Sequence, residues 1–580
     1  TPIEQAQAEL TALAPSFHAA SPTANRNFRA VAVPLRQFLT GGVRHRVLLL
    51  AAFAGLILLI SSANVAHLML SRSVRRASEL AIRLSLGATR RRLLRQLVTE
   101  SLVLSSAAGV AGFVLALWAV RVLAFLVPDS MAMFVIMESA WATLSITAFL
   151  VVFTGLVCGL LPALRISSVN WNQAIRAGSP RVVGGFGQER LRGLLVVSEV
   201  ALAVVLAVGA SLLLRSLYEV LNVDPGFRAE RILTAETSPG RTFWPLRERT
   251  AYIEEALRRI RSLPGVEAAA FMSAAPFTWK GGRLNFQIEG MQAQPEQGAL
   301  NRQVTPDYFA ALRIPVINGR AFTSQDRIGA APVAVINERL AKLWFDGRNP
   351  IGHQVRIAGP KFADAGMRIV GVVGNVREMG LLRDPPPIIY VPHAQTEADF
   401  NVPFTLAVRT AGDPSQLVPA LRSELAAGWA GMPVSRIRTL AQITEAEMAD
   451  RRPVALLGTS LALLAVVLAC VGVYGLLAFS ISQRVPEIGI RMALGASRFV
   501  IASTIMRGAA LLVGCGVLAG TIASAALTQT VRTVLYNIKP HDPMTFVAVP
   551  LVMLALAVLA CLMPVRTALA VDPAIALRKD

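Results

Sequence analysis

Hydrophobic residues in this chain are gathered into long runs instead of recurring at the short periods of a soluble protein. Seven runs have the length that a helix, rising 1.5 Å per residue, needs to cross ~30 Å of hydrocarbon. They are Val47–Leu70, Val98–Val127, Trp141–Leu161, Leu194–Leu214, Val454–Phe479, Val500–Leu527 and Thr545–Leu562. The pattern therefore predicts seven membrane-spanning helices.

Between the fourth and fifth runs, residues 218–453 have the mixed pattern of a water-soluble domain. Alternating apolar and polar positions predict strands, and apolar positions at helical spacing predict helices. The strands are Arg368–Val373, Ile388–Val391 and Phe404–Val408, and the helices are Arg247–Ile260, Glu338–Trp344 and Leu417–Leu425. We expect an α+β domain. Residues 1–40 are polar and mixed as well, with a short helix predicted at Ile3–Leu13 and a strand at Phe28–Leu35.

Basic residues set the orientation of the runs. The chain is 54% apolar and 16% charged, against ~25% charged in soluble domains, and its net charge is +21. Nearly all of the excess is arginine, because only five lysines occur, and it crowds into short segments beside the runs. These are Ser71–Arg95, Pro162–Arg192, Ser480–Arg498 and Pro564–Asp580. By the positive-inside rule they face the cytoplasm, which places residues 218–453 outside and argues against a nucleic-acid partner.

One short charged segment occurs twice. Glu79–Arg90 reads ELAIRLSLGATR and Glu487–Arg498 reads EIGIRMALGASR, with seven of twelve positions identical at an offset of 408 residues. We call these two stretches the twin segments. Each lies between two of the long runs, so the repeat indicates two related membrane units.

The runs around the twin segments repeat as well. Val47–Leu161 matches Val454–Leu562 run for run, and a similar tail follows each set. The second set is preceded by its own run and an outer domain, whereas the first set is preceded only by residues 1–40. We therefore expect an intact protein with eight spans and two outer domains, and a sequence that begins inside the first of these domains.

Further stretches, together with the twin segments, carry a resemblance to a known family. They are VTPDYFAALRIPVINGRAFTSQD from Val304, VAVINERLAKLWFDGRNPIGHQVRI from Val333, RIVGVVGNVRE from Arg368 and IIYVPHAQ from Ile388. With them the chain resembles a permease of the MacB/FtsX type of ABC transporter, in the tandem form with two fused permease halves and with its N-terminal part missing. The resemblance implies an α-helical integral membrane protein with a large α+β periplasmic domain and two FtsX-like transmembrane units.

The resemblance also implies domain bounds. Residues 1–40 are the remnant of a first periplasmic domain, and residues 41–192 are the first FtsX-like unit with its cytoplasmic loop. Residues 193–217 are the membrane helix that opens the second half, residues 218–453 are a MacB-like periplasmic core domain, and residues 454–580 are the second FtsX-like unit.

A function follows from the same resemblance. Such permeases relay the ATP-driven closure of a cytoplasmic ATPase dimer to periplasmic domains by mechanotransmission, and thereby export or extract substrates. The expected partners are that ATPase dimer, the lipid bilayer and a periplasmic adaptor or outer-membrane protein, and the expected location is the bacterial inner membrane. The runner-up is an FtsX-like membrane regulator that transports nothing and acts on a periplasmic partner such as a cell-wall hydrolase. A third alternative is a membrane scaffold without an ATPase.

The twin segments are the first candidate site. From the residues alone, each is either an amphipathic helix lying in the lipid interface or a helix that docks on a protein. In both copies the Glu and the Arg four residues later can pair, and the Gly is placed to end the helix. The resemblance implies a coupling helix docked on the ATPase. The residues assigned to this contact are Glu79, Ile82, Arg83, Leu86 and Gly87, and Glu487, Ile490, Arg491, Leu494 and Gly495.

Glu199 is the second candidate, because it is the one acidic residue well inside a predicted span. An ionised carboxylate at mid-membrane costs ~2.5–3.5 kcal/mol on insertion scales. Glu199 is either an interfacial glutamate paired with an arginine or a hydroxyl, or an intramembrane lock between helices of the relay.

The sequence carries no signature of chemistry of its own. No Gly-Lys pair occurs, so a GxxxxGK[ST] phosphate loop is absent, and we expect ATP and Mg²⁺ in a separate ATPase subunit. No GxSxG or HExxH motif is present, the six histidines lack metal spacing, and the four cysteines lie inside apolar runs. We therefore expect no enzymatic activity, no metal and no cofactor in this chain.

Overall fold

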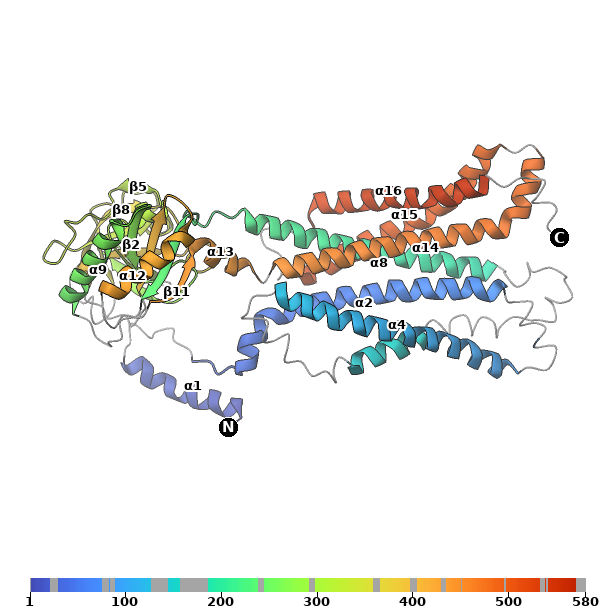
Figure 1. Ribbon diagram of the computed structural model, residues 1–580, viewed down its shortest axis with the longest axis horizontal. Helices are drawn as coiled ribbons and strands as arrows, with labels where there is room; N and C mark the ends of the chain where they lie inside the picture. Colours follow the sequence, from blue (N-terminus) through green and yellow to red (C-terminus); the bar gives the residue numbers. More distant parts are fainter. Residues whose placement is uncertain are drawn as a thin grey trace. The chain divides into compact units, whose positions relative to one another are not determined.

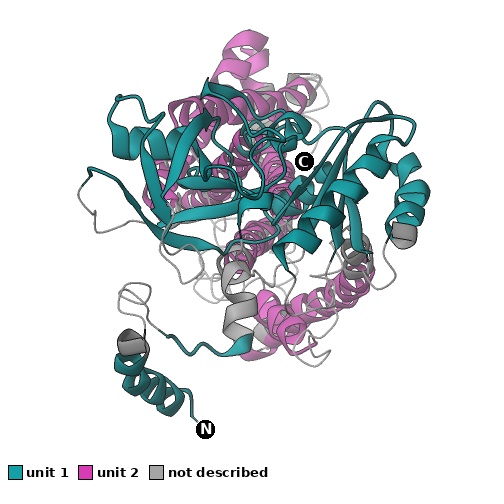
Figure 2. Ribbon diagram, turned by 90° about the vertical axis from the view of Figure 1, so that its left-hand side faces the viewer, with its two compact units in different colours: residues 1–39, 220–450 teal, residues 40–219, 451–580 magenta. Residues whose placement is uncertain are grey.

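The computed structural model describes residues 2–20, 30–75, 83, 89–126, 144–156, 186–237, 245–291, 298–357, 366–396, 404–428, 434–449, 451–494, 497–531, 538 and 541–569. The chain divides into two compact units (Figure 2). Unit 1 comprises residues 1–39 and 220–450, and unit 2 comprises residues 40–219 and 451–580.

Unit 2 consists of long apolar helices that lie side by side (Figure 1). They are α2 (Leu35–Arg75), α4 (Arg90–Leu126), α8 (Phe186–Leu221), α14 (Arg452–Ala493), α15 (Arg498–Val531) and α16 (Pro543–Leu569). Each contains a stretch long and apolar enough to cross a membrane, which matches six of the seven predicted spans. The remaining one, Trp141–Leu161, is described only as the short apolar helix Leu144–Leu156, and its crossing stays a prediction.

Helix α8 is the most deeply packed of the described membrane helices. Side chains such as Val204 and Leu206 are fully buried, in an apolar cluster that α2, α14, α15 and α16 share with α8. Two glycines of α15 bring its backbone close to α8. A Cβ at Gly516 would lie 2.8 Å from Val200 Cβ, and one at Gly520 would lie 2.6 Å from the carbonyl oxygen of Ala201. Small residues at this spacing let membrane helices approach closely.

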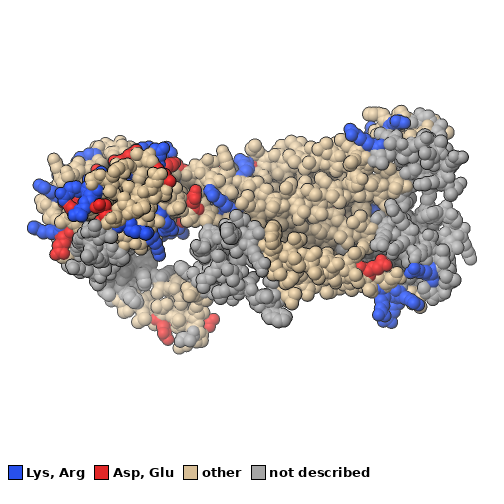
Figure 3. Space-filling view, in the orientation of Figure 1, with Lys and Arg blue, Asp and Glu red and all other residues tan. Residues whose placement is uncertain are grey.

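The surface of unit 2 separates charged from uncharged side chains. A broad surface without charges covers the flanks of the helices, and basic side chains gather at one end, near the starts of α4 and α15 (Figure 3). Large apolar side chains lie exposed on these flanks, among them Leu115, Leu463 and Leu511. An exposed apolar surface of this extent is stable against lipid and not against water.

Unit 1 is built on a sheet of eleven strands. They are β1 (Ile232–Thr237), β2 (Val266–Met272), β3 (Arg283–Ile288), β4 (Gly298–Val304), β5 (Val316–Gly319), β6 (Val333–Asn337), β7 (Gln354–Ile357), β8 (Met367–Val373), β9 (Ile388–Pro392), β10 (Phe404–Thr410) and β11 (Val434–Thr439). Their order is β11-β1-β10-β2-β4-β3-β7-β8-β6-β9, and β5 pairs with β8. Because β4 also pairs with β9, the last six strands of this path close into a ring.

Helices cover the sheet through two apolar clusters. The helices of unit 1 are α1 (Ile3–Ala20), α9 (Leu246–Arg261), α10 (Tyr308–Leu312), α11 (Glu338–Phe345), α12 (Val418–Gly428) and α13 (Leu440–Met448), with 3-10 turns at His393–Gln395 and Pro414–Leu417. Helices α9 and α12 pack on β1, β2 and β10, and α11 packs on strands of the ring. The side chain of Asn337 caps α11 by accepting from the N–H of Leu340, and Thr439 and Gln442 form a capping box at α13.

All six elements predicted for residues 218–453 are confirmed to within three residues at each end. The predicted helix at Ile3–Leu13 is confirmed within α1.

The predicted strand Phe28–Leu35 is wrong in its described part, since residues 30–34 are irregular and Leu35 begins α2. Here the backbone bonds to a side chain instead of a strand, because Gln7 donates to the Ala30 oxygen (3.1 Å) and accepts from the Ala32 N–H (2.7 Å).

Candidate functional site

The end of α14 contains the described part of the second twin segment. The helix continues through the segment to Ala493, and the N–H of the next residue, Leu494, bonds to the Ile490 oxygen at 3.0 Å. Ile490 is 49% exposed and Leu494 is 83% exposed, and Arg491 is exposed as well. The structure therefore presents three of the predicted contact residues on an open surface.

Most of the other predicted contact residues lie outside the described part of the chain. These are Glu79, Ile82, Leu86, Gly87 and Gly495, together with the side chain of Glu487. In the first copy Arg83 is described, and its Nη1 donates to Gln96 Oε1 of α4 at 3.2 Å. The Glu–Arg pairs and the helix-ending glycines stay predictions.

The exposed apolar surface of the second copy continues onto the first residues of α15. This extension of the surface was not predicted from the sequence. Phe499 is 81% exposed and Val500 is 55% exposed. At the offset of 408 residues, their equivalents beside the first copy are Arg91 and Arg92, which are also exposed. The two copies thus carry different chemistry next to a shared motif. A comparison of the flanking residues would have found this difference.

Glu199 lies in α8, ~10 Å along the helix from Arg192 at 1.5 Å per residue. Its side chain is fully buried, and neither carboxyl oxygen has a hydrogen-bond partner among the described residues. The interfacial alternative requires a carboxylate near water that is paired with an arginine or a hydroxyl. The burial and the missing partner do not fit that alternative.

Two residues from other helices border the Glu199 carboxyl. A Cβ at Gly472 of α14 would overlap Oε2 of Glu199 and would lie 2.8 Å from Oδ1 of Asn64 on α2. Asn64 in turn donates from Nδ2 to the Leu468 oxygen of α14 at 3.0 Å. We call Asn64, Glu199 and Gly472 the polar junction. Asn64 interrupts its apolar run visibly in the sequence, whereas Gly472 gives no signal there.

Polar contacts also hold α8 nearer its two ends. The Arg192 guanidinium lies 4.1 Å from the centroid of the Phe479 ring on α14. Toward the other end, Arg215 pairs with Asp542, which also accepts from the N–H (2.9 Å) and the hydroxyl (2.7 Å) of Thr545 in the first turn of α16. Asp542 therefore caps α16 and ties it to α8.

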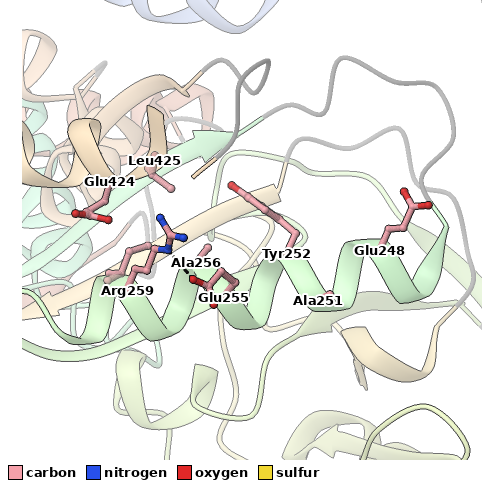
Figure 4. Close-up of a pocket in the computed structure, with 9 residues that line it drawn as sticks. Glu248, Ala251, Tyr252, Glu255, Ala256, Arg259, Glu424 and Leu425 are labelled. Carbon is pink, nitrogen blue, oxygen red and sulfur yellow. Dashed lines mark hydrogen bonds and ion pairs between the residues drawn. The ribbon is translucent and has the colours of Figure 1, made fainter. Parts of the chain in front are cut away.

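Unit 1 carries a hollow of about 380 Å³ between α9 and α12 (Figure 4). Apolar side chains, carboxylates and one guanidinium line it, among them Ala256, Ile260, Leu425, Glu248, Glu255, Glu424 and Arg259. Glu255 is paired with Arg258 and, at 2.6 Å, with Arg259. Within the described ranges, no three His, Cys, Asp or Glu side chains gather into a group that could hold a metal ion.

Two family models match the chain. The model described as "MacB-like periplasmic core domain" matches residues 200–427, and the model described as "FtsX-like permease C-terminal" matches residues 51–171 and 459–573. The first of these ranges covers ten of the eleven strands of unit 1, from β1 to β10, and ends before β11. The second pair covers membrane helices on both sides of the twin segments.

Curated relatives and a solved structure are similar to parts of the chain. The macrolide export ATP-binding/permease protein MacB of Azoarcus sp. (strain BH72) is 25% identical over 358 residues, which is 58% of this chain and 49% of the relative. The pyoverdine export ATP-binding/permease protein PvdT of Pseudomonas syringae pv. tomato is 28% identical over 227 residues, 38% of this chain and 33% of the relative. The periplasmic region of MacB from Actinobacillus actinomycetemcomitans aligns at 14% identity with a TM-score of 0.28, over 39% of this chain and 97% of that chain.

The chain thus spans 49% or less of the length of these two curated relatives. The periplasmic domain lies in sequence between α8 and α14, so the Leu221 end of α8 is periplasmic and its Arg192 end is cytoplasmic. The two family models and the relatives show that this multipass inner-membrane chain belongs to the MacB/FtsX-type family of ABC transporter permeases.

Proposed function

We propose that this chain is the permease subunit of an ABC transporter that works by mechanotransmission. ATP-driven motion of a cytoplasmic ATPase dimer, which holds ATP and Mg²⁺, passes through the membrane helices to the periplasmic domain and drives the export or extraction of substrates. No Gly-Lys pair occurs in the 580 residues, which supports a motor outside this sequence. In this proposal a periplasmic adaptor or outer-membrane protein completes the route.

The observation that carries the proposal is the length of α14. The helix has 42 residues, or ~63 Å, about twice the ~30 Å of a bilayer's hydrocarbon core. It begins at Arg452, directly after the last residues of unit 1, and it ends in the second twin segment. A displacement imposed on the twin segment therefore reaches the border of the periplasmic domain through one helix. Pro486 removes one backbone hydrogen bond just before Glu487 and gives the segment a point at which to bend.

The exposed apolar side chains of the second twin segment are the surface that a protein partner would cover. The apolar stretch of α14 ends at Ser482, and Leu494 comes twelve residues later, beyond Pro486. A protein surface below the membrane would cover Leu494 and Phe499 in place of water.

Crosslinking tests the proposal directly. The four native cysteines are replaced by Ala, and one cysteine is introduced as Ser85→Cys or Ala493→Cys. Both variants should crosslink to an ATPase that co-purifies from native membranes, and Gly329→Cys in the periplasmic domain should not. Labelling of position 85 or 493 from the periplasmic side would overturn the topology, and the absence of any ATPase under mild detergent would overturn the proposal. If the ATPase were recovered together with a cell-wall hydrolase and without an adaptor, the result would favour the regulator over the exporter.

A further inference from the structure

The hydrogen bond that Asn64 donates fixes the direction in which its side-chain amide points. Asn64 donates from Nδ2 to the Leu468 oxygen of α14, so its Oδ1 faces the other way. On that side lies the Glu199 carboxyl, because Oδ1 of Asn64 and Oε2 of Glu199 both border the point where a Cβ of residue 472 would stand. Each lies within 2.8 Å of that point, so two oxygen acceptors lie close together inside an apolar core.

Two facing acceptors form a hydrogen bond only when one of them carries a proton. An amide oxygen cannot supply a donor at this position, whereas a neutral carboxylic acid has one O–H. An ionised carboxylate without a partner is also costly inside a membrane. The nearest basic groups on the same helices are His67, one turn from Asn64 on α2, and Arg192, two turns from Glu199 on α8. Neither forms a hydrogen bond with the carboxyl oxygens.

The junction lies where equivalent positions of the sequence repeat meet. At the offset of 408 residues, Asn64 of α2 corresponds to Gly472 of α14. The two residues face each other, and Glu199 reaches their meeting point from α8. The Glu199 side chain of α8 therefore lies beside both FtsX-like transmembrane units at once. Helix α8 is also the helix that leads into the periplasmic domain, and α14 is the helix that returns from it.

We propose that Glu199 is a positioning residue whose neutral carboxyl donates a hydrogen bond to Asn64 Oδ1 across Gly472, and that this bond holds α8 at the meeting point of α2 and α14. Gly472 is required because any side chain there would displace the carboxyl. The proposal goes beyond the proposed function, since it holds for an exporter and for a regulator alike.

The first test is spectroscopic and uses the full chain in lipid nanodiscs at pH 8 without an ATPase. The infrared difference between wild type and Glu199→Gln should show the C=O stretching band of one neutral carboxylic acid. The same band should shift in Asn64→Leu, which removes the acceptor. A difference spectrum with carboxylate bands only would overturn the proposal, because the carboxyl would then be ionised.

The second test compares two glycines one turn apart on α14. Gly472→Ala should lower the melting temperature by roughly 3–8 °C, because the methyl group would overlap the carboxyl. Gly475→Ala is the matched control, since nothing lies within 4 Å of its Cβ position, and it should not lower the melting temperature. Adding Glu199→Ala to Gly472→Ala should recover part of the loss by making room. Equal melting temperatures for the two glycine variants would contradict the geometry.

A third comparison separates a hydrogen bond from a charge. Glu199→Gln keeps an N–H donor toward Asn64 and should melt within about 2 °C of wild type, whereas Glu199→Leu keeps the volume without the donor and should melt lower. If Glu199→Gln fell as far as Glu199→Leu, the negative charge and not the donated bond would be the stabilising feature, and the proposal would be wrong.

Discussion

A buried ion pair in unit 1 lies where the ring of strands closes. Arg302 of β4 donates from Nε to Glu378 Oε2 at 3.1 Å, and the two side chains are 1% and 0% exposed. Arg302 also donates to the carbonyl oxygens of Trp279, Gly281 and Asn301. β4 carries this arginine opposite Tyr390 of β9, the pairing that closes the ring. The charge of Glu378 is thus the only formal charge that compensates the guanidinium among its described hydrogen-bond partners.

Replacing Glu378 with Gln should destabilise unit 1 by about 3–5 kcal/mol, the usual cost of leaving one charge of a buried pair uncompensated. Against a total domain stability of about 5–15 kcal/mol, this loss is large. Replacing both partners with apolar residues of similar size, as in Arg302→Met with Glu378→Leu, should recover most of the loss, because no charge is then left buried.

Hydrogen exchange under increasing denaturant measures this loss of unfolding free energy in the full chain. The exchange is followed in peptides that contain β4 and β9. The control is Lys342→Met, which removes the Lys342–Glu338 pair, whose side chains are 69% and 34% exposed. An exposed pair is worth less than about 1 kcal/mol. If Glu378→Gln cost no more than this control, the reasoning that the guanidinium needs the charge of Glu378 would be refuted.

In α15, Gly520→Ala should destabilise unit 2 by about 1–3 kcal/mol, because the added Cβ would press on Ala201 of α8. The control is Gly508→Ala, which should be neutral or stabilising because its added Cβ would meet open space. Thermal unfolding of the two variants measures the difference. At the second twin segment, Leu494→Asp should weaken ATPase binding at least about tenfold, ~1.4 kcal/mol, in titrations with the purified ATPase, and an unchanged affinity would place the contact elsewhere. In unit 1, burial lowers the pKa of His393 from 6.5 to about 4, and the charge of Arg249 adds to the shift. The unfolded chain takes up this proton first, so the contribution to stability is complete above pH ~6.5 and is lost as the pH falls toward 4. The unfolding midpoint of wild type should fall over this window more steeply than that of His393→Gln.

Hydropathy predicts where the chain crosses the membrane better than it predicts where the helices end. The run Leu194–Leu214 lies inside the longer helix Phe186–Leu221, and the run Val454–Phe479 lies inside Arg452–Ala493. Helical turns that leave the hydrocarbon carry polar residues, which hydropathy counts as loop although the backbone hydrogen bonds continue. For this reason the sequence separates the second twin segment from its span, while the structure shows one helix.

The strands of unit 1 illustrate a different limit. Strands such as β8 and β10 follow from local patterns, but the ring depends on the pairing of β4 with β9, residues far apart in sequence. β4 itself has no alternation to detect, because Asn301, Arg302 and Gln303 are polar and buried all the same. The arginine is tolerated there only because Glu378, 76 residues later, pairs with it. Periodicity contains no information about such a partner.

The polar junction is the part of the site that no single apolar run could predict, although the repeat contains the information. Asn64 and Gly472 are equivalent positions of the two copies, and they lie next to each other. Two asparagines would leave no room for the Glu199 carboxyl, and two glycines would leave it without the Asn64 oxygen. At this contact the two copies therefore have to differ in size and polarity. Positions that differ in this way inside otherwise matching apolar runs, as Asn64 and Gly472 do, are the ones to examine first for contacts between the copies.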